Sequence, residues 1–174
     1  MSVHKKLNQK GVTLVEIILV IAIIGILAST SVMLIGHLRY ADTQKAVETV
    51  DSSLDKLQVQ TMSKAVTPNL YIYHLSDGYY LKIMNDDIKS FNSTKFDKKG
   101  VKLSNNRVDI YMESKDEDAA NKVDGAKFIK VVYKKSASFD KETNKTNVSD
   151  IVIDGVGTYT VKLIEETGKH FIVK

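Results

Sequence analysis

An uninterrupted apolar segment near the start of the chain limits what this sequence can fold into. From Val12 to Gly36, 18 of 25 residues are hydrophobic, and the 20 residues from Ile17 to Gly36 carry no charge. As an α-helix, 20 residues span about 30 Å, the hydrocarbon thickness of a bilayer. The preceding lysines, at positions 5, 6 and 10, have no acid among them, and such a basic flank stays in the cytoplasm. The sequence therefore predicts a single membrane-spanning helix with a cytoplasmic N-terminus.

Three interpretations of this segment compete. A cleaved secretory signal has an apolar core of about 7–15 residues followed by small residues. Ala28-Ser29-Thr30 fits loosely, but the apolar run continues to Ile35. A plain membrane anchor fits the length and the flank but leaves Glu16 unexplained, because an acid in a membrane helix costs on the order of 2–3 kcal/mol at the bilayer centre and less toward the interface. The third interpretation gives Glu16 a partner.

The residues around Glu16 form a specific pattern, in which Lys10-Gly11-Val12-Thr13-Leu14-Val15-Glu16 leads into the apolar run. This pattern resembles the leader junction of type IV pilins and their relatives, where a short basic leader ends in Gly and a Glu follows five residues later. When the family pattern is placed on this sequence, it implies that residues 1–11 are the leader, that Gly11 is its last residue and that Val12 is the first mature residue. The resemblance implies that a membrane-embedded prepilin peptidase cuts between them and N-methylates the new amine of Val12. Val12 departs from the pattern, which most often has Phe or Met there.

The resemblance also gives Glu16 a role in assembly. Glu16 lies four residues after Val12, so in a helix the new amine and the carboxylate share a face. An isolated charge in a low dielectric is very unfavourable, and a nearby opposite charge recovers much of that cost. The resemblance implies that Glu16 meets the Val12 amine of a neighbouring subunit, which neutralises both charges and sets the axial register of a filament.

Beyond the apolar run, the sequence predicts an α+β protein in which the helix continues as the support of a β-rich head. Valines and leucines at positions 47, 50, 54 and 57 form an amphipathic stripe, and no Pro or Gly interrupts the chain from His37 to Thr67. One helix is therefore predicted from Val12 to about Val66, with residues 12–36 as its membrane and filament-core part and residues 37–67 as its amphipathic part. A coiled coil is the alternative interpretation of the stripe, which lasts only about two heptads.

Residues 68–174 are predicted to form one antiparallel sheet whose apolar face lies on the helix stripe. Strand-like segments follow one another at short intervals: NLYIYHL, YYLKIM, VKLS, RVDIYM, AKFIKVVY, DIVID, TYTVKLIE and HFIVK. Two turns, Ser76-Asp77-Gly78 and Glu166-Thr167-Gly168-Lys169, predict hairpins between the first two and the last two of these segments. The alternation in TYTVKLI predicts that Tyr159, Val161 and Leu163 share one face. Two polar stretches, residues 113–125 and 134–149, are predicted to be surface loops, and such loops decorate the filament surface in pilins.

Other chemistry is not favoured. The four histidines have no metal-ligand spacing, no Cys is present, and no phosphate-binding glycine loop or Gly-x-Ser-x-Gly elbow occurs, so the sequence predicts no enzyme and no cofactor. The acidic stretch of residues 113–125 suggests calcium, but Ala120 stands where a calcium loop would place Asp or Asn. The basic residues form no stripe with aromatics, so DNA binding is left open but not favoured. Gly25 is either an ordinary membrane-helix glycine or a point of close helix packing.

The resemblance implies a structural subunit of a type IV pilus that serves surface adhesion or twitching motility. Its partners would be the prepilin peptidase, other pilin subunits, a membrane platform protein and an assembly ATPase. The protein would be a single-pass protein of the cytoplasmic membrane first and part of a surface pilus (fimbrium) later. The alternatives are a pseudopilin of type II secretion or competence and, from another class, a membrane-anchored β-domain adhesin or sensor. The lack of Cys and the Lys, Asn and Ile usage resemble Gram-positive, clostridial members.

Overall fold

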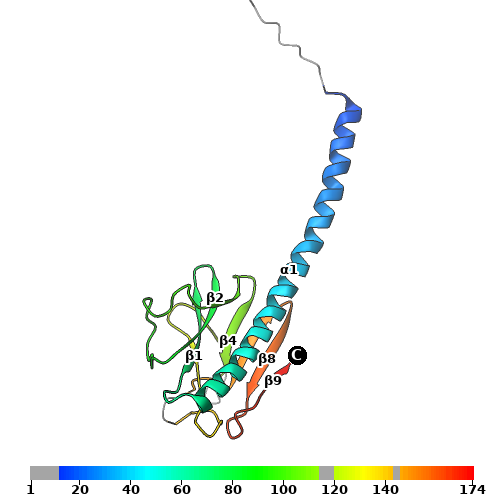
Figure 1. Cartoon of the computed structure of the whole chain (residues 1–174). Helices are drawn as coiled ribbons and strands as arrows, with labels where there is room; N and C mark the ends of the chain where they lie inside the picture. The colour runs from blue at the N-terminus through cyan, green and yellow to red at the C-terminus, as the bar shows by residue number, and fades with distance from the viewer. Residues whose placement is uncertain (1–11, 114–119, 143–145) are drawn as a thin grey trace, which may run out of the picture. The chain divides into compact units, whose positions relative to one another are not determined.

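The computed structural model describes residues 12–113, 120–142 and 146–174, with side chains described throughout these ranges except at residues 30–35. The chain divides into a unit of residues 1–37 and a unit of residues 38–174. The described residues form one helix and nine strands (Figure 1), in the order α1 (Leu14–Ser63), β1 (Asn69–Leu75), β2 (Gly78–Met84), β3 (Val101–Ser104), β4 (Asp109–Glu113), β5 (Asn121–Lys122), β6 (Ile129–Val132), β7 (Asp150–Gly155), β8 (Gly157–Leu163) and β9 (His170–Val173).

Helix α1 is a single element of 50 residues. It begins two residues later than the predicted Val12 and ends three residues before the predicted Val66. The predicted stripe is confirmed: Val47, Val50, Leu54 and Leu57 are all buried in the core of the head. Their 3-4-3 spacing places them on one helix face, which explains why this part of α1 can be polar elsewhere.

The head is antiparallel, as predicted, but it contains two sheets instead of one. The first has the strand order β3-β2-β1-β6 and the second has the order β5-β4-β7-β8-β9. Both predicted hairpins are present, β1 with β2 and β8 with β9, and Gly78 and Gly168 of their turns have positive φ angles of 140° and 64°. The predicted alternation in β8 is also confirmed, because Tyr159, Val161 and Leu163 are buried while their neighbours are not.

Both sheets and α1 share one hydrophobic core. Ile72 of β1, Ile110 of β4 and Ile151 of β7 lie in the same buried cluster as Leu54 of α1. The helix stripe therefore joins the two sheets, and the α+β class with a long N-terminal helix packed on antiparallel sheets is confirmed.

A second buried cluster covers the opposite face of the first sheet. Alternate residues of β1, Tyr71 and Tyr73, pack there with Phe96 from the segment between β2 and β3. The Tyr73 hydroxyl donates to the backbone oxygen of Asp97 at 2.6 Å, and burial raises the pKa of Tyr73 to about 12. Because both faces of β1 are buried, the segment NLYIYHL is hydrophobic almost throughout.

The stretch of residues 134–149 is not simply a surface loop. Phe139, Thr146 and Val148 are buried, so the expectation of a solvated loop is wrong at these positions. The Thr146 hydroxyl accepts from the Val132 amide at 3.0 Å and donates to the Val132 carbonyl at 3.1 Å. The Thr146 side chain thus supplies the partner of the Val132 amide at the outer edge of β6, while the Val132 carbonyl also accepts from the Asp140 amide at 2.8 Å.

The acidic stretch of residues 113–125 falls partly outside the described residues, at 114–119. Its described part includes β5, a two-residue strand that pairs with β4. The apolar side chain of Val123 is buried directly after this strand, which explains why this part of the stretch is held against the sheet.

Replacement of a stripe residue should destabilise the head. We expect Leu54→Ala to lower the free energy of unfolding by about 2–5 kcal/mol, because a fully buried leucine leaves a cavity. The matched control is Leu38→Ala, at an exposed leucine of the same helix, which should change stability by about 0.5 kcal/mol or less. Chemical denaturation of the full chain in detergent micelles measures both, and equal losses for the two variants would contradict the buried stripe.

Candidate functional site

The candidate site is the start of α1, where the sequence predicts processing and assembly. Gly11 lies outside the described residues, while Val12 and Glu16 lie within them. Val12 precedes the helix and its side chain is exposed. The helical spacing of four residues between Val12 and Glu16 therefore does not apply in this structure, because the helix begins at Leu14.

Thr13 caps the helix that contains Glu16. The Glu16 amide donates to the Thr13 hydroxyl oxygen at 3.3 Å and to the Thr13 carbonyl at 3.1 Å. The amide of Ile17 donates to the same carbonyl at 3.2 Å. Thr13 with Glu16 three residues later is the sequence of a capping box, and one of its two bonds is present here.

The capping role of Thr13 was missed by the sequence analysis. The signal was available, because a Ser or Thr followed three residues later by Glu before an apolar run is typical of a helix start. The acid also lies in the first turn, where a negative charge interacts favourably with the helix dipole. Glu16 therefore has a local structural function in addition to any role in assembly.

The carboxylate of Glu16 has no partner among the described residues. Its backbone amide is used by the cap, but the structure gives its side chain no hydrogen bond or ion pair with residues 12–113, 120–142 or 146–174. This leaves the charged group available for a contact outside the described chain.

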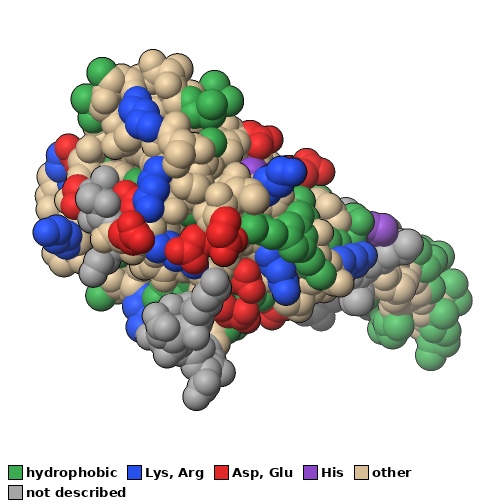
Figure 2. Space-filling view, turned by 90° about the horizontal axis from the view of Figure 1, so that it is seen from below, with side chains coloured by type: hydrophobic (Ala, Val, Ile, Leu, Met, Phe, Trp, Pro, Cys, Tyr) green, Lys and Arg blue, Asp and Glu red, His purple; other side chains and the backbone are tan. Residues whose placement is uncertain are grey.

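The residues that follow Glu16 expose hydrophobic side chains on every face of the helix. From Val12 to Leu27, twelve large hydrophobic side chains are between 47% and 74% exposed, and Figure 2 shows hydrophobic side chains gathered on the visible face of this segment. Soluble monomers do not expose apolar surface of this extent, which marks contact with protein or lipid. In the described part of the chain, no helix combines the length and the hydropathy of a membrane span.

Two small residues sit within the apolar part of α1. A methyl group added at Gly25 would meet no atom within 4 Å in the described chain. The Ser29 hydroxyl donates to the carbonyls of Gly25 at 3.0 Å and Ile26 at 2.9 Å, so its polar group is satisfied within the helix. Neither residue is required for packing within one chain, and a role for Gly25 would have to come from a neighbouring helix.

Comparison with known proteins points to the same segment. Residues 6–32 match the family model for the prokaryotic N-terminal methylation motif. The chain carries the type IV prepilin leader signature. No curated protein and no solved structure matches the chain. The motif supports a pilin-like or pseudopilin substrate of prepilin peptidase, and it describes a structural segment rather than an enzyme family.

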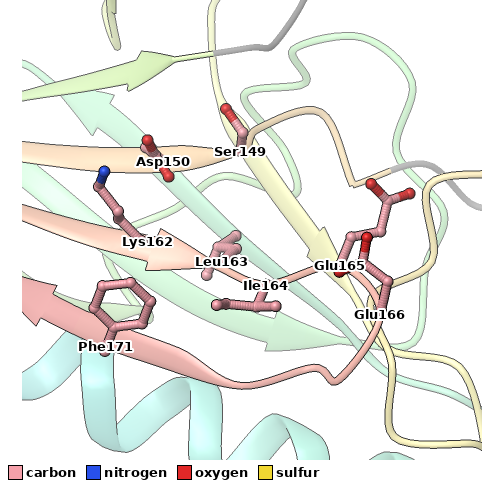
Figure 3. A pocket seen from close by; sticks show the side chains of 8 residues that line it. All are labelled: Ser149, Asp150, Lys162, Leu163, Ile164, Glu165, Glu166 and Phe171. Carbon is pink, nitrogen blue, oxygen red and sulfur yellow. The ribbon is translucent and has the colours of Figure 1, made fainter.

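Polar side chains around one pocket in the described part of the head are engaged in local contacts. One pocket of about 280 Å³ lies beside the β8–β9 hairpin (Figure 3), and Ser149, Lys162 and Glu165 are among its lining residues. The Ser149 hydroxyl donates to the Glu113 carbonyl at 3.0 Å, and Glu165 pairs with Lys141 at 3.2 Å. These polar groups serve the local structure, and they do not form a nucleophile with an adjacent base.

Removal of the cap should loosen the first turn of α1. We expect Thr13→Ala to weaken the first turn by about 1 kcal/mol, which corresponds to about fivefold faster amide exchange at Glu16 and Ile17. Hydrogen exchange of the full chain in detergent micelles measures this effect. The matched control is Thr13→Ser, which restores a hydroxyl acceptor and should exchange at nearly the original rate. Equal rates for all three proteins would contradict the capping role.

Proposed function

We propose that this protein is a prepilin that becomes a structural subunit of a type IV pilus, cut after Gly11 and polymerised through the apolar part of α1. The single observation that carries the proposal is the match of residues 6–32 to the N-terminal methylation motif. The function of the filament that fits best is surface adhesion or motility.

The exposed apolar surface of α1 supports the two environments that this function requires. Before assembly, the 20 uncharged residues from Ile17 to Gly36 would lie in the cytoplasmic membrane, with residues 1–11 on the cytoplasmic side. After assembly, the same side chains would pack against the helices of neighbouring subunits. Because helix–helix packing and lipid contact both suit an all-apolar surface, one sequence serves both states.

Changes in charge at the N-terminus would favour transfer of the chain from the membrane to the filament. Cleavage removes Lys5, Lys6 and Lys10 and creates an α-amine on Val12. The unpartnered carboxylate of Glu16 would then pair with the amine of a neighbouring subunit. Loss of the leader charges would ease transfer from the membrane to the filament, because charged groups resist passage through the hydrocarbon region.

The partners follow from this sequence of events. A prepilin peptidase would cut and methylate the chain, a membrane platform protein and a cytoplasmic assembly ATPase would add it to the filament, and other pilins would contact α1. A pseudopilin of a secretion or competence system would share the same processing and the same helix contacts.

The mature N-terminus tests processing directly. We expect mass spectrometry of the protein from its native cell envelope to find a chain that begins at N-methylated Val12. A Gly11→Leu variant should retain its leader, because the residue at the cut site is replaced by a bulky side chain. An intact N-terminus in the unchanged protein, or a start at another residue, would contradict the proposed function.

The charge of Glu16 should be required for assembly but not for cleavage. We expect Glu16→Ala and Glu16→Gln to be processed normally and to yield at least about tenfold fewer subunits in sheared filaments. Removal of one partner of a buried ion pair costs about 3–5 kcal/mol, which exceeds the value of about 1.4 kcal/mol for a tenfold change. Glutamine retains the capping-box sequence, so the Gln variant tests the loss of the charge without a loss of the helix cap.

The matched control is Glu48→Gln, at an exposed glutamate in the amphipathic part of the same helix. It should leave filament yield unchanged. Quantitative immunoblots of sheared filaments compare the variants, and a normal yield from Glu16→Gln would contradict the proposed pairing.

A further inference from the structure

A cluster of potential metal ligands lies in the head, in the unit of residues 38–174. Asp51 and Asp55 come from α1, and His170 is the first residue of β9. The His170 Nε2 atom is 3.2 Å from Asp51 Oδ1 and 3.7 Å from Asp55 Oδ1. One ligand atom from each residue lies within 4.8 Å of the others.

The fold holds these three residues together by separate means. The two aspartates are one helical turn apart, on a helix fixed by its buried stripe. His170 is placed by the pairing of β9 with β8, in which it lies opposite Leu163. The turn before it is anchored where the Tyr133 hydroxyl donates to the Gly168 carbonyl at 3.2 Å. The cluster is thus built on rigid elements.

The environment of His170 is unusual for a simple surface ion pair. Its side chain is only 7% exposed, and its Nδ1 atom is buried without a hydrogen-bond partner among the described residues. A protonated ring would bury a positive charge with one N–H group unpaired, which is unfavourable. A neutral ring would leave the two aspartates without a compensating charge inside the cluster, and like charges at this spacing destabilise a helix.

A cation bound between the three residues removes the need for a protonated ring and supplies the missing compensating charge. It would neutralise the carboxylates and bind the Nε2 lone pair of a neutral imidazole. Metal–ligand distances of about 2.0–2.2 Å place ligand atoms roughly 3–4 Å apart, and the Nε2 atom of His170 lies 3.2 Å and 3.7 Å from the two carboxylate oxygens. A pocket of about 300 Å³ lined by Asp51, Asp55 and His170 leaves room for water at the remaining positions.

We propose that Asp51, Asp55 and His170 bind one divalent transition-metal ion, with zinc as the best match to one imidazole and two carboxylates. Calcium and magnesium favour oxygen ligands alone, so the histidine selects against them. Lys169 also lines the pocket, and its positive charge would repel a bound cation. The bound ion would fasten β9, the edge strand of its sheet, to α1.

Isothermal titration of the full chain in detergent micelles with zinc chloride tests the proposal. We expect one saturable site per chain. Asp51→Asn, Asp55→Asn and His170→Gln should each weaken binding at least about tenfold, as loss of a ligand does. Zinc should also raise the thermal unfolding midpoint of the unchanged protein, and a chelator should reverse that shift.

Two controls make the result specific. Asp154→Asn and His37→Gln change the same residue types outside the pocket, and both should bind zinc as the unchanged protein does. The Asp55 side chain is 70% exposed, so Asp55→Asn is expected to fold even if His170→Gln does not. The proposal is overturned if the unchanged protein shows no saturable binding up to about 1 mM zinc. It is also overturned if Asp55→Asn binds zinc with unchanged affinity.

Discussion

The burial of one face of α1 is the constraint on which the head depends. Val50, Leu54 and Leu57 lie in a cluster that also contains residues from both sheets, so neither sheet closes its apolar face without the helix. A sheet with one unburied apolar face is unstable in water, and here the helix acts as the second layer for two sheets at once. Residues 38–63 of α1 are therefore an integral part of the globular unit.

Before residue 30, the hydrophobic side chains of the same helix have a different distribution. There the hydrophobic side chains surround the helix, and the chain itself buries none of those described. An all-apolar helix requires surroundings that the described chain does not supply, which is why the function proposed here rests on lipid before assembly and on other subunits after it. The sequence itself shows the change from hydrophobic residues on all faces of α1 to hydrophobic residues on one face. This change separates the exposed apolar part of α1 from the part that packs in the head.

Much of this arrangement could be predicted from the sequence because it depends on local patterns. The stripe of α1, the two hairpins and the alternation in β8 follow from periodicity and turn residues, which are read over a few positions. The division into two sheets was not predictable in this way, because it depends on which strands pair, and β4 pairs with β7 across a long stretch of chain. The burial of Thr146 was missed for a related reason: its hydroxyl completes the edge of β6, and a polar residue in a polar stretch gives no sign of that partner.

The same limit explains why the cluster of Asp51, Asp55 and His170 could not be predicted from the sequence. Searches for metal sites rely on short spacing between ligands, and here the third ligand comes from the last strand. Two acids one turn apart on a polar helix face are common and carry little information alone. Only the packing of β9 beside α1 brings an imidazole to them.

The start of α1 shows how one residue can meet two requirements without conflict. The cap uses the backbone amide of Glu16 and the hydroxyl of Thr13, and it leaves the carboxylate without a partner among the described residues. Any acid in the first turn would suit the helix dipole, so the local structure does not require a glutamate in particular. In the proposed assembly, the length of the side chain would matter as well, because the carboxylate would have to reach an amine on another chain while its backbone stays in the helix. An aspartate would keep the charge and shorten that reach by one methylene, so the proposed pairing, and not the helix start, would favour a glutamate at this position.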